Sequence, residues 1–261
     1  MARFIFENLP LLISLVLFIL LHSSLKVATD STQEANALLK WAATLHNLKD
    51  SNISSWPLLQ NATNSIPRTS PCNWVGLSCN RNGRIERLNL TNADLNAFQT
   101  HLSDLSYNLL SGTIPQEIGF LTNLDTLHLA ANKLNGSIPS TIGQLGSLTE
   151  LALYTNSLDG LIPPSMGNLT KMVRLFLYEN QLSGLIPPEI GKLTNLVEIY
   201  MDSNSLSGPI PSSFGNLTNL TVLFLFRNQL SSSIPQEIGN LKSLNSLSLY
   251  RNSFLAQFRQ H

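Results

Sequence analysis

The chain has 261 residues, of which 43% are hydrophobic and 12% are charged, and its 16 basic and 16 acidic side chains balance to a net charge of zero. This composition supplies enough apolar material for one long folded domain. A neutral chain lacks the concentrated positive charge that attracts phosphate backbones or acidic lipids. Composition therefore argues against nucleic acid as a partner and against electrostatic membrane binding.

Residues 1–28 have the pattern of a secretory signal peptide. Arg3 supplies a positive charge, and residues 9–21 form an apolar run, interrupted by Pro10 and Ser14, that is short for a membrane span. We expect removal by signal peptidase, with an uncleaved N-terminal anchor as the alternative. No later stretch is apolar for long enough to cross a bilayer, so membrane attachment is expected only through that anchor or a full-length form.

Residues 29–83 are expected to form the N-terminal cap of a longer domain. The sequence S-T-Q-E is a capping box that makes Ser31 the helix N-cap and Glu34 the third helical residue. Four apolar residues then follow at helical spacing on one face: Leu38, Trp41, Ala42 and Leu45. Such an amphipathic helix can cover the apolar end of a repeat domain.

The two cysteines, Cys72 and Cys79, have six residues between them. They could be half of a metal site, a redox pair or a structural disulfide. The C-x6-C spacing, with no third ligand nearby, differs from zinc spacings and from the C-x-x-C redox motif. In a secreted chain we favour the disulfide.

Residues 84–120 are expected to hold irregular first repeats. The segment that starts at Arg84 reads as a strand, but Ala93 occupies the place of an asparagine that recurs later every 24 residues. The next such asparagine, Asn108, follows after only 15 residues. We interpret this part as a coil shortened by about nine residues. The interpretation predicts irregular structure over residues 96–107 and leaves the continuity of the sheet open.

From residue 121 to residue 254 a 24-residue sequence is written five times in full and once in part. Within each L-x-L segment the leucines alternate with polar or aromatic residues, so a short strand turns Leu127 and Leu129 inward. A closing asparagine recurs in every repeat: Asn132, Asn156, Asn180, Asn204, Asn228 and Asn252. We expect its side chain to point inward and to hydrogen-bond backbone groups of the turn after the strand.

One repeat cannot be stable alone. Ordering its residues costs roughly 1.5 kcal/mol each, whereas about seven buried aliphatic side chains contribute roughly 2 kcal/mol apiece. Stacking coils removes both faces of each coil from water. The period and the L-x-x-L-x-L-x-x-N-x-L pattern are typical of leucine-rich repeats, which form solenoids.

The second half of each repeat carries a further motif. It reads LNGSIP at Leu134, LDGLIP at Leu158, LSGLIP at Leu182 and LSGPIP at Leu206, and three of the five full repeats end in I-G-N/Q/K. These motifs resemble the plant-specific class of leucine-rich repeats. They are most similar to the ectodomains of plant leucine-rich-repeat receptor-like kinases, and the N-terminal region is similar to the male-discoverer-interacting subgroup. The resemblance covers almost everything after residue 30.

The resemblance implies an α/β repeat solenoid. We expect a right-handed superhelix with a parallel sheet on its concave face, short 3-10 or irregular segments on its convex side and a helical N-terminal cap, in which Cys72 and Cys79 are paired. Residues 255–261 replace the expected motif with a divergent tail. The family's transmembrane helix and kinase domain do not follow, so we interpret the chain as truncated before them, with an open apolar end.

Outward positions of stacked strands form columns across the concave face. Seven aromatic residues fall in two neighbouring columns, and exposed aromatic residues at this density suggest a recognition surface. The candidate ligand-binding residues are Tyr154, Arg174, Phe176, Tyr178, Glu198, Tyr200, Asp202, Phe224, Phe226, Arg227 and Tyr250. In the alternative interpretation the rings pack on one another and only stabilise the sheet.

Seven N-x-S/T sequons are candidate glycosylation sites in a secreted chain: Asn52, Asn61, Asn89, Asn135, Asn168, Asn216 and Asn219. We expect about half or more of them to be used. Asn89 lies between Leu88 and Leu90 on the expected concave face, where a glycan would obstruct a ligand. The binding region is therefore expected within residues 150–251.

Catalytic signals are missing from the sequence. It contains no phosphate-binding glycine loop, no kinase motif, no H-E-x-x-H and no G-x-S-x-G. His128, with Asp125 three residues before it, is more simply a solvated strand residue than a catalytic or metal-binding one. We expect no enzymatic activity, cofactor, metal ion or small-molecule substrate.

The sequence therefore predicts a secreted or cell-surface recognition module. The resemblance implies a peptide or protein ligand, a possible co-receptor ectodomain as partner, and a role in signal perception. Two alternatives stay open. One is a leucine-rich inhibitor of a cell-wall hydrolase, which binding to a fungal hydrolase would distinguish; the other is a non-functional fragment of a receptor kinase gene.

Overall fold

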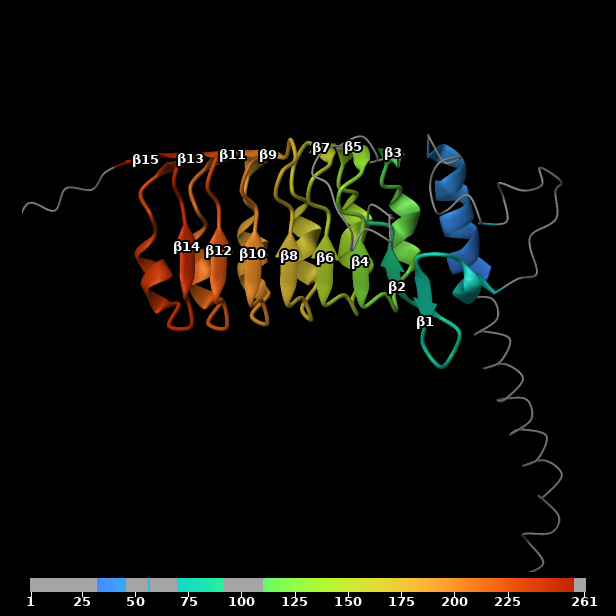
Figure 1. Cartoon of the computed structure of the whole chain (residues 1–261). Helices are drawn as coiled ribbons and strands as arrows, with labels where there is room; N and C mark the ends of the chain where they lie inside the picture. Colours follow the sequence, from blue (N-terminus) through green and yellow to red (C-terminus); the bar gives the residue numbers. More distant parts are fainter. Residues whose placement is uncertain (1–31, 46–55, 57–69, 92–109, 256–261) are drawn as a thin grey trace, which may run out of the picture.

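A computed structural model describes residues 32–45, 56, 70–91 and 110–255. In this part of the chain, coils stack side by side into an elongated solenoid with an α-helix (residues 32–44) across its N-terminal end (Figure 1). The expected signal peptide, the N-cap Ser31, residues 96–107, the sequons at Asn52 and Asn61 and the last six residues lie outside the described residues.

The main sheet has eight strands, one from each successive coil after an N-terminal hairpin (Figure 1). Strand β1 (Leu77–Cys79) pairs antiparallel with β2 (Ile85–Asn89), and all later pairs are parallel. The later strands are β4 (Thr126–His128), β6 (Glu150–Ala152), β8 (Arg174–Phe176), β10 (Glu198–Tyr200), β12 (Val222–Phe224) and β14 (Ser246–Ser248). Neighbouring strands pair in strict 24-residue register from β4 onward, so equivalent residues of successive repeats lie side by side.

A second side of the solenoid carries shorter strands from the middle of each repeat. They form two sheets, β3 (Ser111–Thr113), β5 (Lys133–Ser137) and β7 (Ser157–Asp159), then β9 (Ser183–Leu185), β11 (Ser205–Gly208), β13 (Gln229–Ser232) and β15 (Ser253–Phe254). The glycine of the L-x-G-x-I-P motif turns the chain here with a positive φ, for example +71° at Gly184. Only glycine adopts this conformation without strain.

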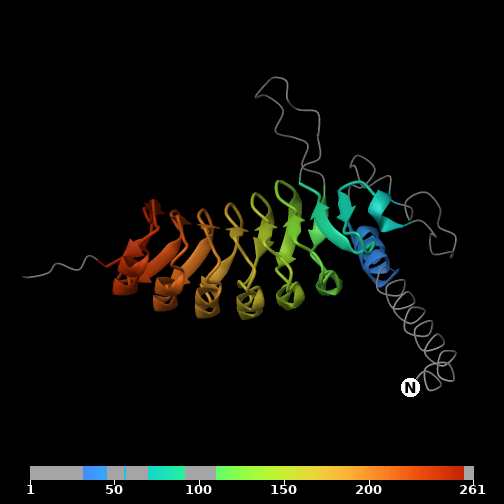
Figure 2. The same ribbon diagram turned by 90° about the horizontal axis from the view of Figure 1, so that it is seen from below.

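The third side consists of 3-10 helices, which line up along one edge of the solenoid in Figure 2. They are η5 (Gln116–Phe120), η6 (Ser140–Gln144), η7 (Pro164–Asn168), η8 (Pro188–Lys192), η9 (Ser212–Asn216) and η10 (Gln236–Asn240). Each follows the proline of its repeat, whose fixed φ suits the start of a helical turn. This side is the predicted convex side.

The glycine inside each 3-10 helix allows adjacent coils to approach closely. A Cβ atom built on Gly191 would overlap the backbone carbonyl oxygen and the side chain of Ser213 in the next coil. The same obstruction recurs between Gly143 and Ser165. At Gly239 in the last described coil, by contrast, nothing lies within 4 Å of such an atom. The I-G motif in the sequence does not by itself predict this packing role.

The interior is filled by the repeat leucines and their equivalents, which are fully buried from Leu127 to Leu225. The asparagine ladder runs beside them as predicted. Asn228 donates from Nδ2 to the carbonyl oxygens of Met201 (3.0 Å) and Leu225 (3.1 Å), and its Oδ1 accepts from the Leu206 amide (3.0 Å). The Asn228 side chain therefore joins its own coil to the preceding one and satisfies backbone groups that the turn leaves unpaired.

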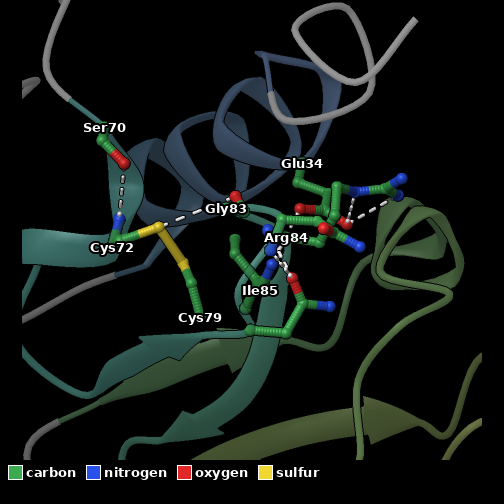
Figure 3. Close-up of a disulfide and its surroundings, with 9 residues drawn as sticks. Glu34, Ser70, Cys72, Cys79, Gly83, Arg84 and Ile85 are labelled. Carbon is green, nitrogen blue, oxygen red and sulfur yellow. Dashed lines mark hydrogen bonds and ion pairs between the residues drawn. A yellow bond between two sulfur atoms is a disulfide. The ribbon is translucent and has the colours of Figure 1, made fainter. Parts of the chain in front are cut away.

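The N-terminal cap has the expected elements. Leu38, Trp41, Ala42 and Leu45 are all buried. The indole nitrogen of Trp41 donates to the Thr113 carbonyl oxygen at 2.9 Å, which joins the helix to the first coil. Cys72 and Cys79 form a disulfide of 2.06 Å (Figure 3). The pairing confirms the structural interpretation of these two residues.

Glu34 has a larger role than the capping box predicted. Its side chain is 1% exposed, and its carboxylate accepts hydrogen bonds from the Arg84 guanidinium (2.8 Å) and the Ile85 amide (3.0 Å) (Figure 3). Burial raises the pKa of Glu34, and the bonds from Ile85 and Arg84 oppose that rise. The carboxylate therefore fastens the helix to the start of β2 across 50 residues of sequence. Sequence spacing carries no signal for a contact of this kind.

The irregular first repeats differ from the prediction. Strand β2 pairs directly with β4, with Leu88 opposite Leu127, so the paired residues are 39 positions apart, which equals 24 plus 15. No strand lies between them, and the sheet is continuous. The interpretation as a separate shortened coil was wrong, because β2 and β4 are direct neighbours and leave no place between them for its strand.

The C-terminal end of the described solenoid exposes apolar side chains, as predicted. Ile234 and Leu247 are each 45% exposed, whereas their equivalents one coil earlier, Ile210 and Leu223, are 2% and 0% exposed. The difference arises because nothing in the described part of the chain stacks on the last coil. Among the described residues, we find no helix with the length and apolar character that a membrane crossing requires.

Candidate functional site

The outward face of the main sheet, the predicted concave face, brings the candidate residues together. The position between the two buried leucines of each repeat contributes Phe176, Tyr200 and Phe224. The position after the second leucine contributes Tyr154, Tyr178, Phe226 and Tyr250. Because the strands pair in 24-residue register, these seven residues, which we call the aromatic strip, lie in two adjacent rows.

The rings of the aromatic strip contact one another along its length. Tyr154 stacks on Tyr178 with centroids 4.6 Å apart, and Phe226 stacks on Tyr250 at the same distance. Edge-to-face contacts join Tyr200 to Phe176 (5.2 Å) and to Phe224 (4.9 Å). Tyr250 is 54% exposed, and the other six rings are half-buried by their neighbours. The strip thus stabilises the sheet and still presents aromatic surface to solvent.

A row of alternating charges borders the strip at the start of the strands. Arg174 pairs with Glu150 (3.1 Å) and lies 3.7 Å from Glu198, and His128 Nε2 lies 2.9 Å from Glu150. Arg174 and Glu198 were predicted to contact a ligand. The structure places them in a ladder whose charges already offset one another. His128 therefore belongs to this surface ladder, and Asp125 instead accepts from Thr149 and Thr126.

Asp202 is the one predicted ligand-binding residue that the structure buries. It is 5% exposed, and the hydroxyl of Ser203 donates to its carboxylate at 3.2 Å. Burial raises the pKa of Asp202, and Glu179 raises it further, whereas the Ser203 hydroxyl and Arg227 lower it. Burial also raises the pKa of Tyr178 to about 12, with smaller contributions from Tyr154, Glu179 and Asp202.

Replacing the charge of Asp202 should therefore stabilise the fold. A pKa raised above its ordinary value of 3.8 means that the folded chain loses stability as the pH rises through the raised pKa. We expect Asp202→Asn to raise the melting temperature by about 2 °C at pH 7. The difference should vanish below about pH 4, where the carboxyl is protonated in both states.

A series of thermal unfolding curves from pH 3 to pH 8 checks this expectation. The charged groups nearest to Asp202 are Glu179 and Arg227, and Tyr178 and Tyr200 are neutral throughout that range. Asp159→Asn, at an exposed position of β7, serves as the control and should show no pH-dependent gain. A lower melting temperature for Asp202→Asn at pH 7 would contradict the expectation.

Five of the candidate glycosylation sites lie in the described part of the chain, and all five asparagines are exposed: Asn89, Asn135, Asn168, Asn216 and Asn219. Asn89 lies in β2 between the buried Leu88 and Leu90, as predicted. Asn219 donates from Nδ2 to the Thr194 carbonyl oxygen at 2.9 Å, so a glycan there would compete with that bond. Asn89 accepts a hydrogen bond from the Thr91 amide through Oδ1 at 3.0 Å and does not use Nδ2 for it.

Comparison with known families identifies the repeats. Models of the leucine-rich repeat match residues 123–145, 147–169, 171–193 and 194–254. These ranges coincide with the coils of the solenoid from β4 to β15. The repeat domain itself is non-catalytic, and the chain matches only the ectodomain region of the kinases to which it is similar.

Two curated relatives are receptor kinases of Arabidopsis thaliana. The chain is 44% identical over 115 residues to a probable leucine-rich repeat receptor-like protein kinase, and 47% identical over 122 residues to MDIS1-interacting receptor like kinase 2. The first alignment covers 40% of this chain and 10% of the relative, and the second covers 42% and 11%. The chain therefore spans only a small part of either protein.

Two solved ectodomains have the same fold. The structure of PEPR1 with AtPEP1 superposes with a TM-score of 0.73 at 32% identity, over 85% of this chain and 28% of the other. The ectodomain of the plant membrane receptor kinase GASSHO1/SCHENGEN3 from Arabidopsis thaliana, in complex with CASPARIAN STRIP INTEGRITY FACTOR 2, gives 0.71 at 30%, over 85% and 24%. The geometry of the coils, the repeat motif and the similar proteins all indicate leucine-rich repeats. Residues 123–254 carry leucine-rich repeats, and these repeats are similar to those of plant receptor-like kinase ectodomains.

Proposed function

We propose that this chain is an extracellular recognition module that binds a peptide or protein ligand across its aromatic strip. The observation that carries the proposal is the strip itself: seven contiguous rings on the open face of the main sheet. Rigid aromatic side chains provide contact area at little entropic cost and dominate interface energetics. The charge ladder along one edge supplies a polar rim.

The similar ectodomains support a role in signal perception. PEPR1 was solved with AtPEP1, and the GASSHO1/SCHENGEN3 ectodomain was solved with CASPARIAN STRIP INTEGRITY FACTOR 2. The Arabidopsis receptor kinase HAESA was solved with the peptide hormone IDA and the co-receptor SERK1. We propose by extension that a co-receptor ectodomain is a second partner of this chain. In this proposal the outward face of the main sheet binds the ligand, and the second ectodomain binds along an edge of the solenoid.

The proposal includes the organisation of the chain. Residues 1–28 would direct it into the secretory pathway, residues 29–83 would cap the solenoid, residues 84–120 would form its irregular start, residues 121–254 would carry the ligand surface, and residues 255–261 would form a divergent tail. The Cys72–Cys79 disulfide supports export, since such bonds persist in oxidising compartments. Glycans at the exposed sequons fit the same location.

A capture experiment tests the function. The chain, expressed as a secreted protein and immobilised, is exposed to plant extracellular fluid, and retained peptides and proteins are identified by mass spectrometry. The triple variant Phe176→Ala, Tyr200→Ala, Phe224→Ala should retain the captured ligand at least about tenfold less well, because truncation of central aromatic anchors typically costs more than 1 kcal/mol each. Surface plasmon resonance with the identified ligand measures the loss.

A matched control separates binding from folding. Phe120→Ala removes an exposed ring, 45% accessible, from η5 on the opposite side of the solenoid and should leave binding unchanged. Circular dichroism should show that the triple variant keeps its fold. If the triple variant binds like the wild type, or if it loses binding only because it unfolds, the aromatic strip is structural and the proposed function fails.

A further inference from the structure

The row of aromatic residues that follows the strands is interrupted once, by an acid. Asp202 follows β10 at the position that Tyr154, Tyr178, Phe226 and Tyr250 occupy in their own repeats. The two stacked pairs lie on either side of it: Tyr154 and Tyr178 are nearly parallel at 5°, and Phe226 and Tyr250 at 7°. The carboxylate therefore lies in the gap between two aromatic stacks.

Rings from the adjacent row close one side of this gap. Tyr200 lies 6.1 Å from Tyr178, and Phe224 lies 6.0 Å from Phe226, centroid to centroid. Tyr200 and Phe224 also contact each other at 4.9 Å. Four rings thus form a continuous chain of contacts next to Asp202, and all four keep part of their surface in solvent. Asp202 itself keeps 5% of its surface exposed.

The charge of Asp202 is poorly compensated in the structure. Among the described residues, no cationic group lies within salt-bridge distance of its carboxylate, and its hydrogen bond from Ser203 is long at 3.2 Å. Arg227 lowers the pKa of Asp202 less than burial raises it, and Glu179 adds like charge. A carboxylate in this setting loses hydration without gaining an equal attraction. A cation delivered by a ligand would restore that attraction.

We propose that Asp202 and the four rings of Tyr178, Tyr200, Phe224 and Phe226 form a subsite for the guanidinium group of an arginine side chain in the ligand. A planar cation stacks on aromatic faces, and its N–H groups pair with a carboxylate at the base. An anion is disfavoured here because Asp202 and Glu179 repel it. The inference rests on the proposed recognition function and names the chemistry of the ligand at the centre of the strip.

Two synthetic tripeptides test the subsite directly. The probes are acetyl-Gly-Arg-Gly-amide and its citrulline counterpart, in which the guanidinium is replaced by a neutral group of nearly the same shape. Ligand-observed NMR titrations against the secreted wild-type chain measure both dissociation constants. We expect the arginine probe to bind at least about tenfold more tightly, since a charge-assisted bond contributes roughly 1.5 kcal/mol or more. A lysine tripeptide should fall between the two, because ammonium lacks the planar fork.

Variants of the subsite residues test whether the preference for the arginine probe over the citrulline probe arises at this subsite. Asp202→Asn, which keeps the shape and removes the charge, should reduce the ratio of the two affinities to about one, whereas Asp159→Asn on β7 should leave it unchanged. Phe226→Leu should weaken the arginine probe more than the citrulline probe. Equal binding of both probes to the wild type, no binding of the arginine probe, or an unchanged ratio in Asp202→Asn would each overturn the subsite.

The experiments distinguish a failure of the proposed arginine subsite from a failure of the proposed recognition function. If the arginine preference is absent but the triple aromatic variant still loses its captured ligand, the strip recognises a ligand without this cation. If the arginine preference depends on Asp202 but the triple variant keeps the captured ligand, the subsite exists and the larger recognition surface lies elsewhere. Melting temperatures, expected to rise for Asp202→Asn, show that no loss of binding comes from unfolding.

Discussion

Gly191→Ala should lower the free energy of unfolding by about 2 to 3 kcal/mol, whereas Gly239→Ala should change it by less than about 0.5 kcal/mol. The two glycines occupy the same position in their repeats. A methyl group at residue 191 would overlap the backbone of Ser213 in the next coil, and a backbone cannot yield without moving the whole coil. At residue 239 nothing lies within 4 Å. The difference between the two changes in unfolding free energy therefore measures the cost of moving two coils apart.

Urea unfolding followed by far-ultraviolet circular dichroism measures both values. Alanine is also the better helix former, so any intrinsic preference favours the variant in both cases and cannot explain a loss at residue 191 alone. Equal destabilisation at the two positions would mean that the last described coil is covered by other chain or by a partner in solution. No effect at either position would contradict the close packing of the coils.

Asn228→Ala is expected to destabilise the fold by about 3 kcal/mol. The substitution removes the donor for the Met201 and Leu225 carbonyl oxygens and the acceptor for the Leu206 amide, and it leaves these groups buried without partners. Unsatisfied buried groups cost roughly 1 to 3 kcal/mol each, although part of the cost is recovered when water enters. Because the asparagine joins its own coil to the preceding one, the loss should be largest for the interface between the coils of β10 and β12.

Asn195→Ala provides the matched control. Asn195 donates a single bond to the Thr170 carbonyl oxygen at 2.8 Å and lies exposed, where water replaces the lost partner. Its removal should cost less than about 0.5 kcal/mol. Native-state hydrogen exchange can locate the effect, since amides of β10 and β12 should lose protection in Asn228→Ala first. A uniform change along the solenoid, or equal costs for the two asparagines, would contradict the ladder as an inter-coil connection.

The repeats could be predicted almost completely from sequence because their signal is local and recurrent. The positions of Leu127 and Leu129 recur as buried residues in every coil up to Leu225, and the positions between them recur as outward residues. A solenoid places residue i beside residue i+24, so the rows on the main-sheet face follow directly from the alignment of repeats. The seven aromatic residues could be assigned to one face for that reason alone.

The start of the solenoid could not be predicted because its contacts do not repeat. The 15 additional residues between β2 and β4 were interpreted as a short coil, since a repeat alignment treats every segment as part of the array. Glu34 was assigned to its own helix terminus, yet its carboxylate binds Arg84 and the Ile85 amide. Such contacts depend on how the cap packs against the first coil, which no single-sequence pattern encodes.

At the candidate site the sequence by itself determined which residues share a face, and the tertiary structure decided what state each side chain is in. From the sequence, Arg174 and Glu198 were predicted to bind a ligand with their charges. In the folded chain they form a ladder of ion pairs with Glu150. From the sequence Asp202 was predicted to contact a ligand, but in the folded chain it is only 5% exposed. The physical reason is that periodicity fixes the direction of a side chain, whereas burial and pairing depend on the sizes of neighbours one repeat away on either side.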